Sequence, residues 1–292
     1  MRLSQFFATL IMAGLPLLLC AQSPINGFMQ GKGKGNVVVS HFSESYDEVF
    51  LVPQKIQGVP VFDEVTLNSV SLFATYGLSD RLDVILNLPY ITAKGAASEA
   101  LLNDLGFDGE RSGLQDLSVY LKYNPLDYKV GAGTLRFIGA LGLVTPLSNY
   151  PVNEGLQSIL AIGNRATSLN TFLLAQYQMD MGLFASAQAG YSLRNNDVPN
   201  AILSEIKIGY AGKSFYADAW MGSQRSTSGV DILGLGFQGF FPETKVNYTR
   251  AGINLFVPVA KGFGISAGAN TYLNGRNVGD ATGFYGGIVL SY

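Results

Sequence analysis

The chain has 292 residues and a formal net charge of −2, and 14% of its residues are charged, against about 25% in soluble domains. Its basic residues are scattered along the sequence, so nucleic-acid binding is excluded as an expected function. The only cysteine and the only histidine are Cys20 and His41. They exclude a disulfide within one chain and a metal site built from these residue types. We expect neither a metal nor a cofactor.

The first residues have the pattern of a secretory signal peptide. Arg2 gives a positive start, residues 6–19 form an apolar stretch, and cleavage is expected after Ala21. We therefore predict a signal peptide over residues 1–21 and a single domain over residues 22–292.

Cys20 leaves a second interpretation of this leader open. Lipoprotein processing would make Cys20 the lipidated N-terminus of the mature protein. That processing usually requires a small residue directly before the cysteine, and Leu19 occupies this place. Ordinary cleavage is therefore the preferred interpretation.

Beyond the leader, apolar and polar residues alternate with a period of two, which is typical of strands and not of helices. Leu82, Val84 and Leu86, for example, alternate with Asp83 and Ile85. No run of about 18 apolar residues follows the leader, so membrane-spanning helices are not expected. Twelve segments show the strand pattern, and each is long enough to cross a bilayer at a tilt. They lie near 35–46, 65–78, 82–93, 113–123, 134–146, 164–178, 182–194, 202–211, 214–226, 246–258, 262–273 and 281–292.

The connections between these segments alternate in length. Tight turns are expected at Ser79-Asp80, Met179-Asp180, Gly212-Lys213 and Ala260-Lys261, and a somewhat longer turn at 124–133. Long loops are expected at 47–64, 94–112, 147–163 and 227–245. Membrane barrels carry short turns on the periplasmic rim and long loops outside. We predict an all-β, transmembrane, antiparallel up-and-down barrel in a bacterial outer membrane, with both termini periplasmic.

The aromatic residues also favour a membrane barrel over a soluble β-sandwich. Several apolar strand faces end in tyrosine, as interfacial belts do, namely at Tyr76, Tyr90, Tyr123, Tyr177, Tyr191 and Tyr210. Gly287, Leu290 and Tyr292 fit the C-terminal pattern by which outer-membrane barrels are recognised for assembly. The expected partners are outer-membrane lipid, the barrel assembly machinery through the strand that ends at Tyr292, and a small-molecule solute.

The strand parity also assigns the residues that face the lumen. The predicted pore-lining residues are Asp83, Asn87, Asp116, Lys122, Arg136, Arg194, Glu205, Lys207, Asp218 and Arg250. A hydrophilic pore wall with opposed charges is one interpretation. The other is a closed lumen in which these charges pair and nothing passes, because a barrel of twelve strands is intermediate between filled barrels and wide porins.

Three segments, 76–90, 113–123 and 142–147, resemble the outer-membrane barrel family named for the meta-pathway of phenol degradation. They read Tyr-Gly-Leu-Ser-Asp-Arg-Leu-Asp-Val-Ile-Leu-Asn-Leu-Pro-Tyr, Gly-Leu-Gln-Asp-Leu-Ser-Val-Tyr-Leu-Lys-Tyr and Gly-Leu-Val-Thr-Pro-Leu. The end of the leader and residues 26–35 are similar to a Bacteroidota-type member. The resemblance implies a channel or transporter for small solutes, apolar or aromatic compounds among them, and no catalytic residues. Gln115 departs from the family, which tends to have glycine before the aspartate.

An enzyme is the alternative from a different class. Outer-membrane phospholipase A is also a barrel of twelve strands and uses a His-x-Ser pair, and His41 and Ser43 would share one strand face here. A serine nucleophile needs an adjacent base and a group that orients the base. No neighbouring residue completes the set in the sequence, so we expect no enzyme. A non-conducting structural or binding barrel is the remaining alternative.

Two further segments give expectations about the lumen. Gly31, Gly33 and Gly35 alternate with lysines and are expected to form a flexible basic lead-in to the first strand. Residues 232–242 are unusually apolar for a loop. We expect them to fold inward as a plug or an apolar ligand site, rather than to extend a strand.

Overall fold

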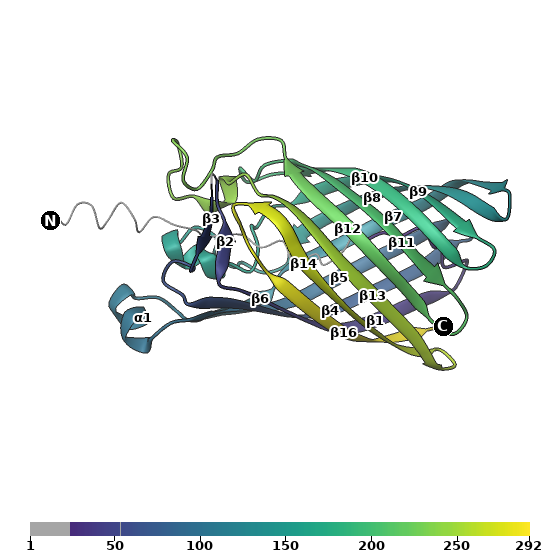
Figure 1. Ribbon diagram of the computed structural model, residues 1–292, viewed down its shortest axis with the longest axis horizontal. Coiled ribbons are helices and arrows are strands. Elements are labelled where there is room, and N and C mark those ends of the chain that lie inside the picture. Colours follow the sequence, from purple (N-terminus) through teal and green to yellow (C-terminus); the bar gives the residue numbers. More distant parts are fainter. Residues whose placement is uncertain (1–23, 53) are drawn as a thin grey trace.

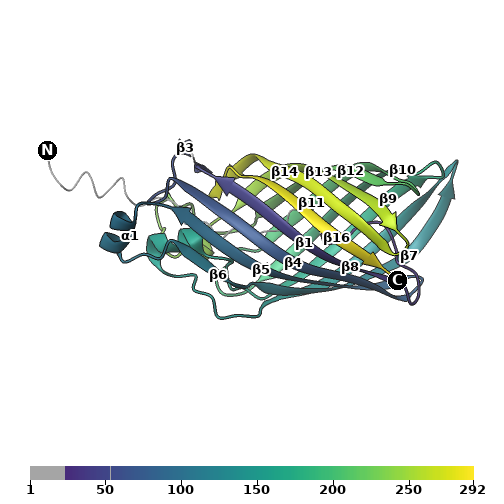
Figure 2. The same ribbon diagram turned by 90° about the horizontal axis from the view of Figure 1, so that it is seen from below.

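The computed structural model describes residues 24–52 and 54–292, and the predicted signal peptide and Cys20 lie outside the described residues. The chain forms a closed antiparallel barrel of tilted strands (Figure 1). Strand β1 pairs with both β16 and β4, which closes the barrel (Figure 2). The prediction of a barrel with twelve strands is confirmed. The strands are β1 (Gly35–Tyr46), β4 (Glu64–Ser79), β5 (Leu82–Ala96), β7 (Asp116–Val130), β8 (Gly133–Pro146), β9 (Ser168–Met179), β10 (Leu183–Arg194), β11 (Ala201–Ala211), β12 (Tyr216–Ser226), β13 (Asn247–Ala260), β14 (Phe263–Arg276) and β16 (Thr282–Ser291).

The hairpin formed by β7 and β8 differs from the prediction. The expected longer turn at 124–133 is wrong, because both strands continue to a tight turn at Gly131-Ala132. The pairing register shifts between Tyr123 and Leu126. Pro125 has no backbone N–H to donate to the ladder, so the strand bulges there instead of ending.

The outward faces of the strands form an apolar belt. Large aliphatic side chains on this surface are exposed, among them Leu173 at 75%, Ile208 at 65% and Ile253 at 61%. Near the rim with the short turns, Tyr76 stacks on Tyr292 with ring centroids 6.4 Å apart. An apolar surface with tyrosine at its edge suits a wall that contacts lipid. None of the helices within residues 24–52 and 54–292 is long and apolar enough to cross a membrane.

The connections at the opposite rim fold into a structure that we name the cap. It contains a small sheet of β2 (Glu48–Phe50), β3 (Lys55–Gln57) and β15 (Val278–Gly279), together with β6 (Glu110–Leu114), which pairs with the end of β5. It also contains α1 (Glu99–Leu105) and the 3-10 turns η3 (Gly155–Leu160) and η4 (Phe241–Glu243). Figure 1 shows α1, β2 and β3 at the end of the barrel away from the C-terminus.

An apolar core holds the cap on the barrel. Phe62, Ile159 and Phe241 from the loops pack in one buried cluster with Leu67 and Ile91 from the barrel strands. Ion pairs lie around this core, including Arg276 to Asp231 at 2.6 Å, Arg111 to Glu154 at 2.6 Å and Lys55 to Asp280 at 2.5 Å. The cap is therefore a packed element and not a set of loose loops.

Segment 232–242 belongs partly to this core. Ile232 and Phe241 are buried, and Phe237 packs against Phe241 with centroids 5.1 Å apart. Leu233 and Leu235 between them are exposed to solvent. The ends of the segment thus pack in the core of the cap, and its middle lies at the surface.

Candidate functional site: the barrel lumen

The ten predicted pore-lining residues all lie on inward strand faces. Seven of the ten are buried, and the half-buried Asn87 shares the parity of Asp83 on β5. Arg136 and Arg194 are half-buried and also point inward, towards Gly27 and Gln224 respectively. Whether these residues line a path for solute stays a prediction.

Most of the luminal charges have partners of opposite sign. Arg250 on β13 donates to the Glu44 carboxylate at 2.8 Å, and its guanidinium lies 4.3 Å from the centre of the Tyr272 ring. Lys207 lies 3.6 Å from Glu205 and 3.8 Å from Asp218. A buried charge is costly unless it is paired, so these pairs allow charged residues inside the wall.

Residues 24–34, the luminal segment, fold back into the barrel before β1 begins. The backbone N–H of Lys34 donates to the Gly31 carbonyl. The positive φ angles of Gly31 (83°) and Gly33 (74°) allow the chain to reverse there. The Gly31 backbone lies so close to Gly77 on β4 that a side chain at position 77 would collide with it. The expected flexible lead-in is therefore wrong, because these glycines form a defined turn.

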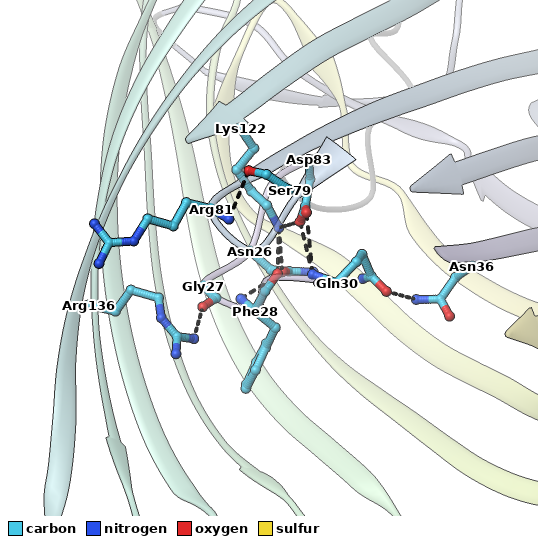
Figure 3. Close-up of polar contacts among 10 residues, drawn as sticks. All are labelled: Asn26, Gly27, Phe28, Gln30, Asn36, Ser79, Arg81, Asp83, Lys122 and Arg136. Atoms are coloured by element: carbon cyan, nitrogen blue, oxygen red, sulfur yellow. Dashed lines mark hydrogen bonds and ion pairs between the residues drawn. The ribbon is translucent and has the colours of Figure 1, made fainter. Parts of the chain in front are cut away.

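Wall charges bind the backbone of the luminal segment (Figure 3). Lys122 donates to the Phe28 carbonyl at 2.5 Å and lies 3.2 Å from the Asp83 carboxylate. The same carboxylate accepts a hydrogen bond from the Gln30 N–H at 3.2 Å, and Arg136 donates to the Gly27 carbonyl at 2.8 Å. Three predicted pore-lining residues thus hold the segment across the lumen.

Apolar side chains of the segment reach other parts of the wall. The Phe28 ring meets Phe184 edge-on, with centroids 5.2 Å apart, and lies 6.0 Å from Tyr216. Ile25 is 1% exposed and packs in a cluster that includes Ile85, on β5. The segment therefore connects strands from opposite sides of the lumen and fills the half of the barrel near the short turns.

Inward aromatic rings lie flat on glycines of neighbouring strands. Tyr120 faces Gly142 in the strand register, and Trp220 faces Gly252. A Cβ atom at Gly142 would lie 2.1 Å from the Tyr120 ring, and one at Gly252 would lie 2.6 Å from the Trp220 ring. Aromatic rings that cover glycines support a sheet at positions without side chains. The arrangement also keeps the large rings close to the wall instead of across the lumen.

Two features of the lumen are absent from the sequence-based set. Glu44 was missed because Val37, Val38 and Val39 are all apolar, which hides the parity of β1. The luminal segment was missed because its partners, such as Lys122 and Arg136, lie about a hundred positions away in the sequence. The apolar residues between the leader and β1 were the only available signal.

The His41 and Ser43 pair lies on the outer surface of the barrel. Both residues alternate with the inward-facing Phe42 and Glu44, and Asn68 on β4 stands opposite Ser43. Within residues 24–52 and 54–292, no hydrogen bond joins His41 to Ser43 or either of them to Asn68. The pair shares a face as expected, but it lacks the contacts that activate a serine.

Comparisons with known proteins show the fold. No family model matches the chain, and no curated protein matches it. The structure is similar to that of an outer membrane channel from Pseudomonas putida F1, with a TM-score of 0.71 and 14% identity over 93% of this chain and 100% of that one. It is also similar to the KdgM porin in complex with disordered oligogalacturonate, with a TM-score of 0.50 and 8% identity over 87% and 99%.

Proposed function

We propose that this protein is an outer-membrane channel that passes small solutes through the barrel lumen, and that the luminal segment is its removable plug. One observation carries the proposal. The wall of the lumen is polar and charged, and the luminal segment fills the half of the lumen near the short turns. This segment joins the barrel through a single glycine turn. A segment attached in this way can leave without any wall strand unfolding.

The contacts of the segment set the balance between closed and open forms. It is held by hydrogen bonds from Lys122 and Arg136, by one to Asp83, and by the packing of Phe28 and Ile25. Each of these hydrogen bonds involves a charged side chain and contributes about 1.5–3 kcal/mol net. Release of the whole segment thus costs several such contributions. The closed form dominates, and openings are rare.

The proposal also covers the family of the protein, the orientation of the barrel in the membrane and the class of solute. Segments 76–90, 113–123 and 142–147 support membership of the phenol meta-pathway family, and apolar or aromatic compounds are among the small solutes proposed. Alternating short and long connections support periplasmic termini and an external cap. Epitope tags in 94–112 and 147–163 should be accessible on intact cells, and a tag at the 79–80 turn should not be.

Single-channel recording of the refolded protein in a planar bilayer tests the channel and the plug. Deletion of residues 24–30 should raise the mean conductance well above that of the wild type. Leu235→Ser, at a fully exposed position in the cap, is the matched control and should behave as the wild type. Equal conductance of the deletion and the wild type would refute the plug. Silence of all three proteins would refute the channel and favour a structural or binding barrel.

A further inference from the structure

The outer wall carries an apolar groove over strands β10 to β14. Its volume is about 950 Å³, and most of its lining residues belong to the outward faces of these strands. The floor of the groove over β12 consists of Ala217 and Ala219. Ala219 pairs with Ile208 on β11 and with Ile253 on β13, and both isoleucines line the groove. Small side chains between larger ones therefore form a trough that follows β12.

The two ridges beside this trough are spaced to hold a hydrocarbon chain. Neighbouring strands lie about 4.8 Å apart, so β11 and β13 are separated by roughly 10 Å across β12. Ile208 and Ile253 stand out from the wall on either side. Lipid chains are as apolar as the wall, so close packing decides what lies against it. A chain in the trough contacts the floor and both ridges, and it gains more dispersion energy than a chain on a flat wall.

The trough ends at the turn between β11 and β12, which has the composition of a headgroup region. The rings of Tyr210 and Phe215 lie 5.0 Å apart at this turn, and Lys213 between them in the sequence is exposed. Tyr210 also lines the groove. Tyrosine is typical of the membrane interface, and lysine side chains extend to the same level. This end of the groove therefore lies where lipid headgroups are found.

Two lysines at this rim have no acidic partner. Lys213 lies in the turn between β11 and β12, and Lys261 lies in the turn between β13 and β14. Because β12 pairs with β13, the two turns are neighbours, at the end of the barrel with the C-terminus (Figure 1). In the part of the chain that the structure describes, neither lysine forms an ion pair, whereas Lys129 on the same rim pairs with Asp180 at 3.0 Å. The mouth of the groove is therefore positively charged.

We propose that this groove binds an anionic phospholipid of the membrane. One acyl chain lies in the trough over β12, and the phosphate lies at the rim near Lys213 and Lys261. The headgroup supplies the negative charge that the two lysines lack, and each lysine near a membrane surface strengthens binding about fivefold. The groove continues the lipid-facing belt of the wall, so a lipid reaches it without leaving the bilayer. Because the site is on the outer wall, its occupation does not depend on the passage of solutes.

Fluorescence quenching in bilayers tests this proposal. Bromine on acyl chains quenches tryptophan at short range, and Trp220, the only tryptophan of the chain, lies behind the trough between Ala219 and Met221. The full chain is reconstituted in phosphatidylcholine with increasing fractions of brominated phosphatidylglycerol or brominated phosphatidylcholine. Brominated phosphatidylglycerol should reach half-maximal quenching at a fraction at least about fivefold lower. Equal quenching by the two lipids would overturn the proposal. The absence of quenching by either would also overturn it and would indicate a second copy of the barrel in the groove.

Matched variants locate the lipid. Lys213→Gln with Lys261→Gln should abolish the preference for phosphatidylglycerol, whereas Lys94→Gln, at an exposed position on the cap side, should retain it. Ala219→Leu fills the trough and should weaken the quenching by brominated phosphatidylglycerol. Its control is Ala74→Leu, on the outward face of β4 and outside the groove. Heat-modifiable migration verifies that each variant is folded. A wild-type preference in the double lysine variant, or unchanged quenching in Ala219→Leu, would refute the site.

Discussion

Lys122 Nζ lies 3.2 Å from the Asp83 carboxylate on the neighbouring strand and 2.5 Å from the carbonyl oxygen of Phe28 in the luminal segment. Asp83 in turn accepts from the Gln30 N–H. This buried pair therefore joins two strands of the wall to the segment that fills the lumen. Loss of one partner should affect both the stability of the wall and the position of the segment.

Lys122→Met should increase the time that the channel spends open. It removes the donor to Phe28 and leaves Asp83 buried without its cation, which costs about 3–5 kcal/mol for a buried pair. Single-channel recording measures the opening, and heat-modifiable migration in gels measures the folded barrel. The double variant Asp83→Asn with Lys122→Met should recover much of the lost stability but remain more open. A double variant as unstable as the single one would contradict this explanation.

The parity of the wall predicts opposite effects at adjacent positions. Leu86 is 41% exposed on the outer face, and Asn87 beside it faces the lumen. Leu86→Arg should destabilise the barrel by about 2–4 kcal/mol, because it places a charge in lipid near the midplane. Asn87→Arg should leave the folded fraction close to that of the wild type. Equal losses of heat-modifiable barrel in the two variants would count against the assignment of faces.

Gly142 should tolerate no large side chain, since the Tyr120 ring covers it. Gly142→Leu must push the ring off the wall and into the lumen, which should narrow the channel and lower its conductance when the luminal segment is deleted. Gly139 on the same strand has nothing within 4 Å of an added Cβ, so Gly139→Leu is the matched control. If both variants conducted equally in that background, the ring would not depend on the glycine.

The cap should loosen in acid. Hydrogen bonds from Arg276 lower the pKa of Asp231 below its usual value of 3.8. A group with a depressed pKa in the folded state stabilises the structure above its unfolded pKa and loses this contribution as the pH falls through the folded value. Pepsin cleavage within 232–242 should therefore accelerate below pH 3.8. Glu48 in the cap also has a lowered pKa, because of its hydrogen bond to Lys55.

The Asp231→Asn variant shows which acidic group of the cap, Asp231 or Glu48, causes the loosening in acid. The amide cannot carry the charge that pairs with Arg276, so pepsin should cut this variant faster even at the upper end of the acidic range. Its rate should then change less on further acidification than that of the wild type. A variant with the same pH profile as the wild type would assign the transition to Glu48 and not to Asp231.

The barrel could be predicted from the sequence because its determinants are local. The alternation around Leu82 and Leu86 fixes both the strand and its outward face, and the same rule places Asp83 and Arg250 inside. Short turns between such strands then leave few possible topologies.

The contents of the lumen could not be predicted in the same way. The contact of Lys122 with Phe28 joins residues 94 positions apart, and neither residue has a pattern that reveals the other. The bulge at Pro125 and the turn at Gly31 and Gly33 similarly depend on pairing partners elsewhere in the barrel. Local periodicity determines the wall, whereas long-range contacts determine what fills it.

A disulfide between the luminal segment and the wall gives the most direct test of the proposed plug. A Cβ at Gly27 would lie 2.7 Å from the Gln176 Cβ. A small shift of the segment would therefore bring the two Cβ atoms to the separation of ~3.8 Å that is typical of a disulfide. In Gly27→Cys with Gln176→Cys, the oxidised protein should not conduct in a planar bilayer, and a reducing agent should restore channel openings. Each single cysteine variant should conduct in both conditions. Full conductance of the oxidised double variant, with the disulfide verified by mass spectrometry, would contradict the account.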